Sequence, residues 1–374
     1  MQKSQNQSWL IKIAIFTLII IAFSLDSRAQ TAQKWPEKKA WDWYNKQPWY
    51  CGFNYIPAYA INYTAMWDKT TFDPKAIDRE LALAEQSGMN SLRAVLQYAV
   101  YEDDPAYFLK TLDTFMALCY KHHIKFIPAL FDDCSFGIKS DPVVGKQPEP
   151  LKGWYAWAWS PSPGHSMVTD STTYPKLEKY VRDIINHHKN DERILFWDLY
   201  NEPTNGGLGS ATFPLLKKVI VWARSINPDQ PLSIGMFDQN PRLNEIIINN
   251  SDIITFHDYG NKETVTRAVE KFQKLNRPLI NTEWMNRPFG STVSEILPIF
   301  YQYKIGCNLW GLVNGKTQTD LPWGHRPGDP PQDLWQHDLY HGDFKPYKPS
   351  EIDTIKEYID RSEKKEYIEL HKHQ

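Results

Sequence analysis

The chain has 374 residues, of which 42 % are hydrophobic and 23 % are charged, a composition that excludes disordered and collagen-like proteins. Its formal net charge is −2, so it has no excess of Lys and Arg to neutralise phosphates, and we expect no nucleic-acid partner. Aromatic residues reach 14 %, including 15 Trp, which fits either a Trp-rich core or a protein that stacks sugar rings on aromatic faces.

The N-terminus has the pattern of a cleavable secretory signal. Lys3 and Lys12 precede an apolar run over residues 13–25, and a Ser-Arg-Ala triplet that resembles a small-residue cleavage site follows the run. The run is shorter than the roughly 20 residues that a membrane-spanning helix needs, so a cleaved signal is favoured over an anchor. We therefore predict a signal peptide over 1–29, one domain over 30–374, a secreted or periplasmic location and no membrane span after cleavage.

The cysteines do not predict a metal site. Cys51, Cys119, Cys134 and Cys307 fit no zinc-ligand spacing, and none of them belongs to a CxxC pair. Although export would permit disulfides, each of these residues also fits a small buried apolar position. We predict no obligatory disulfide.

Eight short runs that are apolar and rich in β-branched or aromatic residues are spaced along the chain. This pattern is typical of parallel strands that are buried on both faces. The predicted strands cover residues 50–56, 91–96, 125–131, 194–199, 232–236, 253–257, 279–282 and 307–310.

Segments with helical periodicity alternate with these runs. They cover residues 74–86, 106–122, 174–188, 213–226, 242–249, 262–275, 293–303 and 351–359. Eight β/α units predict an α/β fold of the (β/α)8 barrel (TIM barrel) type. An open doubly wound sheet is the alternative, but the turn after the first strand lacks the Gly-rich phosphate pattern that such a sheet normally carries.

Two connections are much longer than the others, and both follow predicted strands. Residues 132–172 follow strand three, and residues 311–350 follow strand eight. Long loops after barrel strands lie on the catalytic face. The first of these loops contains three closely spaced Trp residues, among them Trp157, which is a candidate for stacking on a sugar ring.

Polar side chains gather at the predicted carboxyl ends of the strands, where barrel enzymes place their reacting groups. Two of them are glutamates, Glu202 after strand four and Glu283 on strand seven, so they can face each other across the barrel mouth. Glycoside hydrolysis needs such a pair, because one carboxylic acid protonates the leaving oxygen while a second carboxylate meets the anomeric carbon.

The Asn201-Glu202-Pro203 triplet resembles the Asn-Glu-Pro signature of glycoside hydrolase clan A, whose best-known members include family 5, the cellulase family. The strand-seven Glu283 matches the position of the clan's nucleophile. A strand-two Arg, a His-x-Tyr on strand six and a strand-eight Trp also fit. The resemblance implies a single catalytic barrel over the mature chain and a retaining mechanism without a cofactor.

This resemblance also implies a role for each matching residue. Glu202 is the expected general acid and base, with a pKa raised by the nearby carboxylate. Glu283 is the expected nucleophile, held ionised by hydrogen bonds from Arg93 and Tyr259. Asn201 is expected to bind the sugar 2-hydroxyl.

Four further residues are predicted to bind substrate. His257 is expected to orient the acid or bind a sugar hydroxyl, and Trp310 to form the floor beneath the cleaved sugar. Trp284, beside the predicted nucleophile, is another candidate. The end of strand three lacks the His that many cellulases carry nearby, and Asp132 or Asp133 is expected to replace it in sugar binding.

The leading hypothesis is thus a secreted glycoside hydrolase, a monomer whose partner is a β-linked oligosaccharide or polysaccharide. A transglycosylase uses the same two carboxylates, and a non-catalytic carbohydrate-binding barrel is the alternative from another class. No metal is expected. The adjacent His187 and His188 in particular lie about 100° apart on a predicted helix, which makes them a poor chelate.

Overall fold

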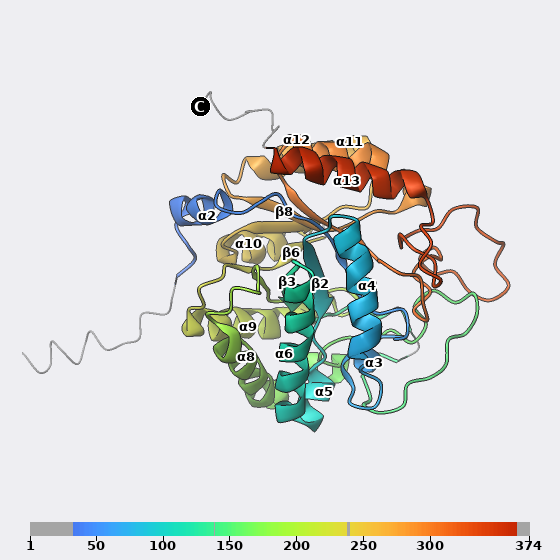
Figure 1. The fold of residues 1–374 in the computed structure, drawn as a ribbon. Helices are drawn as coiled ribbons and strands as arrows, with labels where there is room; N and C mark the ends of the chain where they lie inside the picture. The colour runs from blue at the N-terminus through green and yellow to red at the C-terminus, as the bar shows by residue number, and fades with distance from the viewer. Residues whose placement is uncertain (1–32, 138, 238–239, 365–374) are drawn as a thin grey trace, which may run out of the picture. The chain divides into compact units, whose positions relative to one another are not determined.

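The computed structural model describes residues 33–137, 139–237 and 240–364 (Figure 1). The predicted signal peptide over 1–29 lies outside these residues. Within them, no helix has both the length and the apolarity needed to cross a bilayer.

The strands of the described chain form one parallel sheet in the order β5-β4-β3-β2-β1-β9-β8-β7-β6. The two ends of this order, β5 and β6, are consecutive pieces of one predicted run that are separated only by Ile234, so the sheet curls into a nearly closed barrel and confirms the predicted (β/α)8 fold. The strands are β1 (Cys51–Asn54), β2 (Ser91–Val95), β3 (Lys125–Ala129), β4 (Trp197–Asp198), β5 (Leu232–Ser233), β6 (Gly235–Met236), β7 (Ile254–His257), β8 (Leu279–Trp284) and β9 (Gly306–Trp310).

Helices surround the sheet (Figure 1). Those between the strands are α4 (Pro74–Gln86), α6 (Pro105–Lys121), α8 (Tyr174–His188), α9 (Phe213–Ile226), α10 (Pro241–Asn250), α11 (Lys262–Gln273) and α12 (Val293–Gln302), and α13 (Pro349–Glu363) follows the last strand. Shorter helices are α2 (Glu37–Tyr44), α3 (Tyr63–Trp67), α5 (Tyr98–Asp103) and α7 (His165–Thr169), with 3-10 turns η1 (Ser171–Thr173), η2 (Gly209–Thr212) and η3 (Arg287–Phe289).

Local sequence explains where several of these helices begin. The side chains of Asp73, Asp104 and Asn240 accept hydrogen bonds from first-turn N–H groups of α4, α6 and α10, and each is followed by a Pro at the first helical position. The pattern satisfies donors that have no partner inside the helix.

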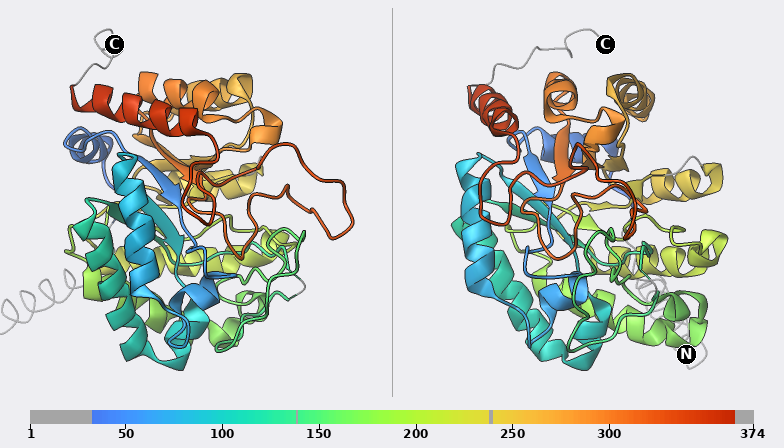
Figure 2. Two further views of the ribbon diagram at one scale, coloured as in Figure 1. Left: turned by 45° about the vertical axis from the view of Figure 1, so that its right-hand side comes forward. Right: turned by 90° about the vertical axis from the view of Figure 1, so that its right-hand side faces the viewer.

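The two long loops lie on the same side of the barrel, at the carboxyl ends of the strands (Figure 2). They are joined by backbone hydrogen bonds from Tyr155 N to His325 O at 3.0 Å and from Ala156 N to Thr317 O at 3.1 Å. The roof over the barrel mouth is therefore one joined structure built from both loops, as their predicted positions after strands three and eight require.

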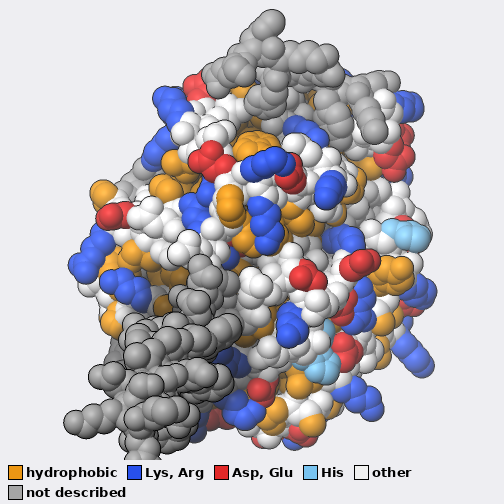
Figure 3. Space-filling model, turned by 90° about the vertical axis from the view of Figure 1, so that its left-hand side faces the viewer, with side chains coloured by type: hydrophobic (Ala, Val, Ile, Leu, Met, Phe, Trp, Pro, Cys, Tyr) orange, Lys and Arg blue, Asp and Glu red, His pale blue; other side chains and the backbone are white. Residues whose placement is uncertain are grey.

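Positive and negative side chains are interspersed on the face of the molecule drawn in Figure 3, in keeping with the small net charge. All four cysteines, Cys51, Cys119, Cys134 and Cys307, are buried free thiols.

Candidate active site

A cavity of about 470 Å³ opens at the carboxyl ends of the strands, in the size range of ligand pockets. Its wall combines the two predicted glutamates with a set of aromatic side chains. The lining residues are Tyr63, Val95, Cys134, Phe136, Tyr155, Trp159, Asn201, Glu202, Asn205, Phe237, His257, Asp258, Tyr259, Glu283, Trp310 and Trp323.

The carboxylate of Glu283, on β8, accepts hydrogen bonds from two side chains. Arg93 Nη1 donates to Oε1 at 2.7 Å, and the Tyr259 hydroxyl donates to Oε2 at 2.6 Å. Both carboxylate oxygens thus have a hydrogen-bond donor that fixes their position. The two predicted donors to this carboxylate are in contact with it.

Arg93, in the middle of β2, is the centre of a buried polar network. Its Nε and Nη2 donate to Asp198 Oδ2 at 2.8 and 2.6 Å, its Nη1 to Asn54 Oδ1 at 2.9 Å, and its Nη2 to Asn201 Oδ1 at 2.6 Å. Burial opposes the guanidinium charge, but the carboxylates of Asp198 and Glu283 outweigh it, so the pKa of Arg93 is raised. Arg93 therefore stays charged in the barrel.

Glu202 receives three donors at the other side of the cavity. His257 Nδ1 lies 2.7 Å from its Oε1, while Asn205 Nδ2 and Cys134 Sγ donate to its Oε2, the thiol at 3.2 Å. Gly235 makes room for the imidazole, because a Cβ at that position would lie 2.9 Å from His257 Nε2.

The protonation of this pair differs from the expectation for Glu202. Burial raises the pKa of Glu202, but the hydrogen bond and charge of His257 outweigh it, so the net pKa is lowered rather than raised. Burial lowers the pKa of His257, but the carboxylates of Glu283 and Glu202 outweigh it and the pKa is raised. The sequence predicted that His257 would orient the acid or bind a sugar hydroxyl, but not that this imidazole would lower the pKa of Glu202.

The backbone at Glu202 is strained, with a φ of 41°. Asp133 holds the turn that follows, because its Oδ2 accepts from Thr204 N at 2.8 Å and its Oδ1 accepts from the Tyr200 hydroxyl at 2.7 Å. Burial raises the pKa of Asp133 to about 6. This turn directs the Glu202 side chain to the cavity wall.

The two glutamates face each other closely. A carboxylate oxygen of Glu202, a ring nitrogen of His257 and a carboxylate oxygen of Glu283 all lie within 4.8 Å of one another. His257 and Glu283 are register partners on β7 and β8, next to an irregularity in the pairing, which brings them together. The same three side chains have the donor atoms to hold a cation.

Of the other predicted substrate-binding residues, Asn201 and Trp310 line the cavity and three do not. Asp132 is fully buried and accepts from Asn201 Nδ2 at 2.7 Å and Trp159 Nε1 at 3.0 Å, so it holds two lining residues. Trp157 packs against Trp154 within the loop.

The prediction for Trp284 is wrong in this structure. The side chain is fully buried and packs edge-on against Phe300 of α12, with ring centroids 5.6 Å apart. Successive residues of a strand point to opposite faces, so Glu283 faces the barrel mouth while Trp284 faces the helices.

Several lining residues were not predicted as site residues. Cys134 and Asn205 contact Glu202, and Tyr155, Trp159 and Trp323 come from the two long loops. The count of Trp in these loops pointed to stacking, but which ring reaches the cavity depends on how the loops dock. Asn205 is three residues after Glu202, a spacing that could have been noticed.

Comparison with known proteins agrees with this geometry. The family model described as cellulase (glycosyl hydrolase family 5) matches residues 56–315. A search of curated protein sequences found no match.

Solved structures share the fold at low identity. An endo-β-1,4-mannanase from Thermotoga petrophila has 15 % identity and a TM-score of 0.56, with 87 % of this chain and 79 % of that chain covered. The exo-β-1,4-mannosidase Op5Man5 from Opitutaceae bacterium strain TAV5 has 16 % identity and a TM-score of 0.57, with coverage of 83 % and 60 %. A GH5_18 protein from Streptomyces cattleya in complex with Manβ1-4GlcNAc has 13 % identity and a TM-score of 0.56, with coverage of 84 % and 81 %. The barrel, its paired glutamates and the family match over most of the chain lead to one conclusion: the chain belongs to glycosyl hydrolase family 5, the cellulase family, and is a glycoside hydrolase of clan A.

Proposed function

We propose that the chain is a secreted, monomeric, retaining β-glycoside hydrolase with one catalytic domain over 30–374, in which Glu283 is the nucleophile and Glu202 the acid and base. One observation carries this proposal: oxygens of the two carboxylates lie within 4.8 Å of each other. Retaining enzymes hold their carboxyl groups about 5–5.5 Å apart, whereas inverting enzymes leave about 6.5–9.5 Å for a water molecule.

In the first step, the Glu283 carboxylate bonds to the anomeric carbon while the bond from that carbon to the leaving oxygen breaks. Glu202 gives its proton to the leaving oxygen. In the second step, Glu202 takes a proton from water, whose oxygen bonds to the anomeric carbon and releases Glu283. Arg93 and Tyr259 keep Glu283 ionised and aligned before attack.

Between turnovers, His257 holds the proton that Glu202 later donates to the leaving oxygen. In the free cavity the charged imidazole faces the Glu202 carboxylate at 2.7 Å. Substrate that enters the cavity displaces water, which favours the neutral pair, and the proton moves from His257 Nδ1 to Glu202. Glu202 thereby becomes the neutral, protonated acid only when substrate is present.

We further propose short β-linked oligosaccharides or chain ends as the substrate, with β-1,4-mannosides as the first choice. The joined loops supply Tyr155, Trp159 and Trp323 to the wall of a cavity of about 470 Å³. Solved structures with this fold include an endo-β-1,4-mannanase, an exo-β-1,4-mannosidase and a GH5_18 protein in complex with Manβ1-4GlcNAc.

Product analysis tests this function. The mature protein is incubated with β-mannan, glucomannan, cellulose, xylan, mixed-linkage glucan, galactan, their oligosaccharides and matched aryl β-glycosides, with Glu283→Ala as the blank. Mannose released from manno-oligosaccharides, and absent in the blank, supports the proposal. A mixture of long products from one polymer would indicate internal cleavage of the chain instead of action at chain ends. Products longer than the substrate would favour a transglycosylase, and binding without turnover a carbohydrate-binding barrel.

The acid role has its own test. Glu202→Ala should retain the first step on an aryl glycoside with a good leaving group, which needs little protonation, and lose it on a natural linkage. Added azide should speed the second step on the aryl glycoside by replacing the water that Glu202 activates. An equal loss on good and poor leaving groups, without azide rescue, would contradict the assignment.

A further inference from the structure

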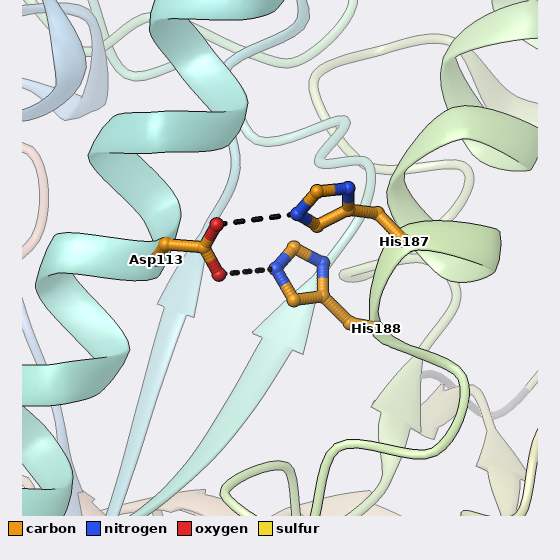
Figure 4. A group of neighbouring side chains, drawn as sticks. All are labelled: Asp113, His187 and His188. Carbon is orange, nitrogen blue, oxygen red and sulfur yellow. Dashed lines mark hydrogen bonds and ion pairs between the residues drawn. The ribbon is translucent and has the colours of Figure 1, made fainter.

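Three side chains converge between α6 and α8, and none of them lines the active-site cavity (Figure 4). Asp113 of α6 faces His187 and His188, which are the last two residues of α8. His187 Nε2 lies 3.2 Å from Asp113 Oδ2, and His188 Nε2 lies 3.1 Å from Asp113 Oδ1. The His188 side chain is buried, whereas those of Asp113 and His187 are 41 % and 45 % exposed, so the group is reached from solvent.

The two adjacent histidines, which were expected to make a poor chelate, both direct a ring nitrogen to the same carboxylate. The two rings lie with centroids 4.5 Å apart, and a carboxylate from the neighbouring helix completes the set. One oxygen and two nitrogen atoms of the group all lie within 4.8 Å of one another.

The hydrogen bonding of His188 leaves a contact that needs a cation. Its Nδ1 lies 3.1 Å from the Ile184 carbonyl oxygen, which can only accept, so Nδ1 carries a proton. In a neutral ring Nε2 is then a lone pair that faces an Asp113 oxygen. A positive ion bound by both atoms resolves the conflict.

The neighbouring cation does not resolve it. Arg193 Nη2 lies 3.4 Å from Asp113 Oδ1, but the guanidinium is bound mainly to Asp191, through Nε at 2.9 and 3.0 Å and through Nη2. The contact of Arg193 with Asp113 also supplies no proton or ion to the imidazole nitrogens. The positive charge of Arg193 weakens the binding of a cation but does not remove a ligand atom.

The buried histidine His122 shows the contrasting arrangement. Its two ring nitrogens each lie 2.8 Å from a different carboxylate, Glu85 and Asp78. In the α6–α8 group both rings instead direct Nε2 to one carboxylate, which is the arrangement of ligands around a shared ion.

We propose that Asp113, His187 and His188 bind one divalent transition-metal ion of the zinc class and so connect α6 to α8. Ligand atoms 3.1–3.2 Å apart fit an ion at about 2.0–2.2 Å from each, the usual Zn–N and Zn–O distances. Imidazole and carboxylate donors select zinc, copper or nickel over magnesium. The carboxyl end of α8 adds a favourable partial negative charge. Water would fill the remaining positions.

Calorimetric titration of the full chain with Zn²⁺ and with Mg²⁺ tests the site. His371 and His373 are replaced by Ala in every protein used, because these C-terminal histidines can also bind zinc. His187→Ala and Asp113→Asn are compared with the control His123→Ala, another histidine near a helix C-terminus, whose side chain is 85 % exposed. The unfolding temperature of each protein without metal verifies that it is folded.

The parent and His123→Ala should each bind one Zn²⁺ at the site and unfold at a higher temperature with zinc, whereas Mg²⁺ has no such effect. His187→Ala and Asp113→Asn should bind zinc at least about tenfold more weakly, because even changes to residues behind a ligand cost 10–100-fold. Equal zinc affinity and stoichiometry in all four proteins would overturn the proposal, as would zinc that binds only where it inhibits turnover, at the active-site glutamates.

Discussion

Arg93 donates to Glu283 over 2.7 Å while the same guanidinium donates twice to Asp198, so one buried cation serves two carboxylates. Asp198 belongs to β4 and Glu283 to β8, on opposite sides of the barrel. Through this arrangement the guanidinium fixes the nucleophile relative to the turn that carries the acid, since it also donates to Asn201, the neighbour of Glu202.

Replacement of Arg93 therefore affects both stability and turnover. Arg93→Met leaves Asp198 without its buried cation and removes one of the donors to Glu283, and removal of one partner of a buried ion pair costs about 3–5 kcal/mol. Chemical denaturation should show this loss of unfolding free energy, and kcat should fall with it. Arg93→Lys keeps the charge but not the planar set of donors, so it should recover stability better than kcat. Unchanged stability in Arg93→Met would contradict the network.

The Glu202–His257 pair predicts a pH window for stability. The pKa of His257 is raised, so its contribution is complete below the ordinary value of 6.5 and is lost as pH rises through the raised pKa. The pKa of Glu202 is lowered, so its contribution is complete above the ordinary value of 4.5 and is lost as pH falls through the lowered pKa. The pair therefore stabilises the fold most between pH 4.5 and 6.5.

Unfolding free energies of wild type and His257→Gln, measured across pH 3–9, test this window. The difference between the two proteins should be largest between the two ordinary pKa values and should shrink on both sides. A difference that stays constant with pH would mean that His257 acts by packing alone.

Cys134 is a positioning residue for Glu202, to which its thiol donates at 3.2 Å. Because this bond favours the carboxylate, Cys134→Ala should raise the pKa of Glu202 in the substrate complex, where Glu202 carries the proton, and move the alkaline limb of the kcat profile to higher pH. Cys134→Ser keeps a donor and should leave the limb close to that of wild type. Superimposable profiles for all three proteins would exclude this role.

Two Trp residues at the ends of neighbouring strands should behave differently. Trp310 lines the cavity and lies 5.8 Å, centroid to centroid, from Trp159, so Trp310→Ala should lower kcat/KM by about tenfold, or about 1.4 kcal/mol. Trp284 is buried against α12, and Trp284→Ala should cost about 3–5 kcal/mol of unfolding free energy instead. A loss of substrate affinity in a stable Trp284→Ala protein would reverse these assignments.

Much of the barrel follows from the sequence because its parts are local. The ranges predicted for α4, α8 and α9 agree with the structure to the residue, since a Pro at or next to the start marks each of these helices. β4 is shorter than predicted, only Trp197–Asp198, and the fifth run is divided into β5 and β6. A run of apolar residues predicts that a segment is buried, but the length of the strand depends on its backbone hydrogen bonds to strands that are distant in the sequence.

Site residues were predictable from the sequence where they lie on a barrel strand or directly after it. Glu202, Glu283 and Arg93 follow from strand position, whereas Trp284 was misjudged because its neighbour in sequence faces the other side of the sheet. Trp159 and Tyr155 could not be selected, because the loop that holds them is positioned by hydrogen bonds to residues more than 150 positions away, Thr317 and His325.

The most direct test of the proposed mechanism is the mass of the active-site peptide after reaction with a 2-deoxy-2-fluoro β-glycoside of the sugar that the product analysis identifies. This reagent slows the second step and accumulates the covalent intermediate. We predict one glycosyl adduct per chain, on the peptide that contains Glu283, and none on the Glu283→Ala protein. An adduct on another residue, or turnover with inverted anomeric configuration and no adduct, would contradict the assignment of Glu283 as nucleophile.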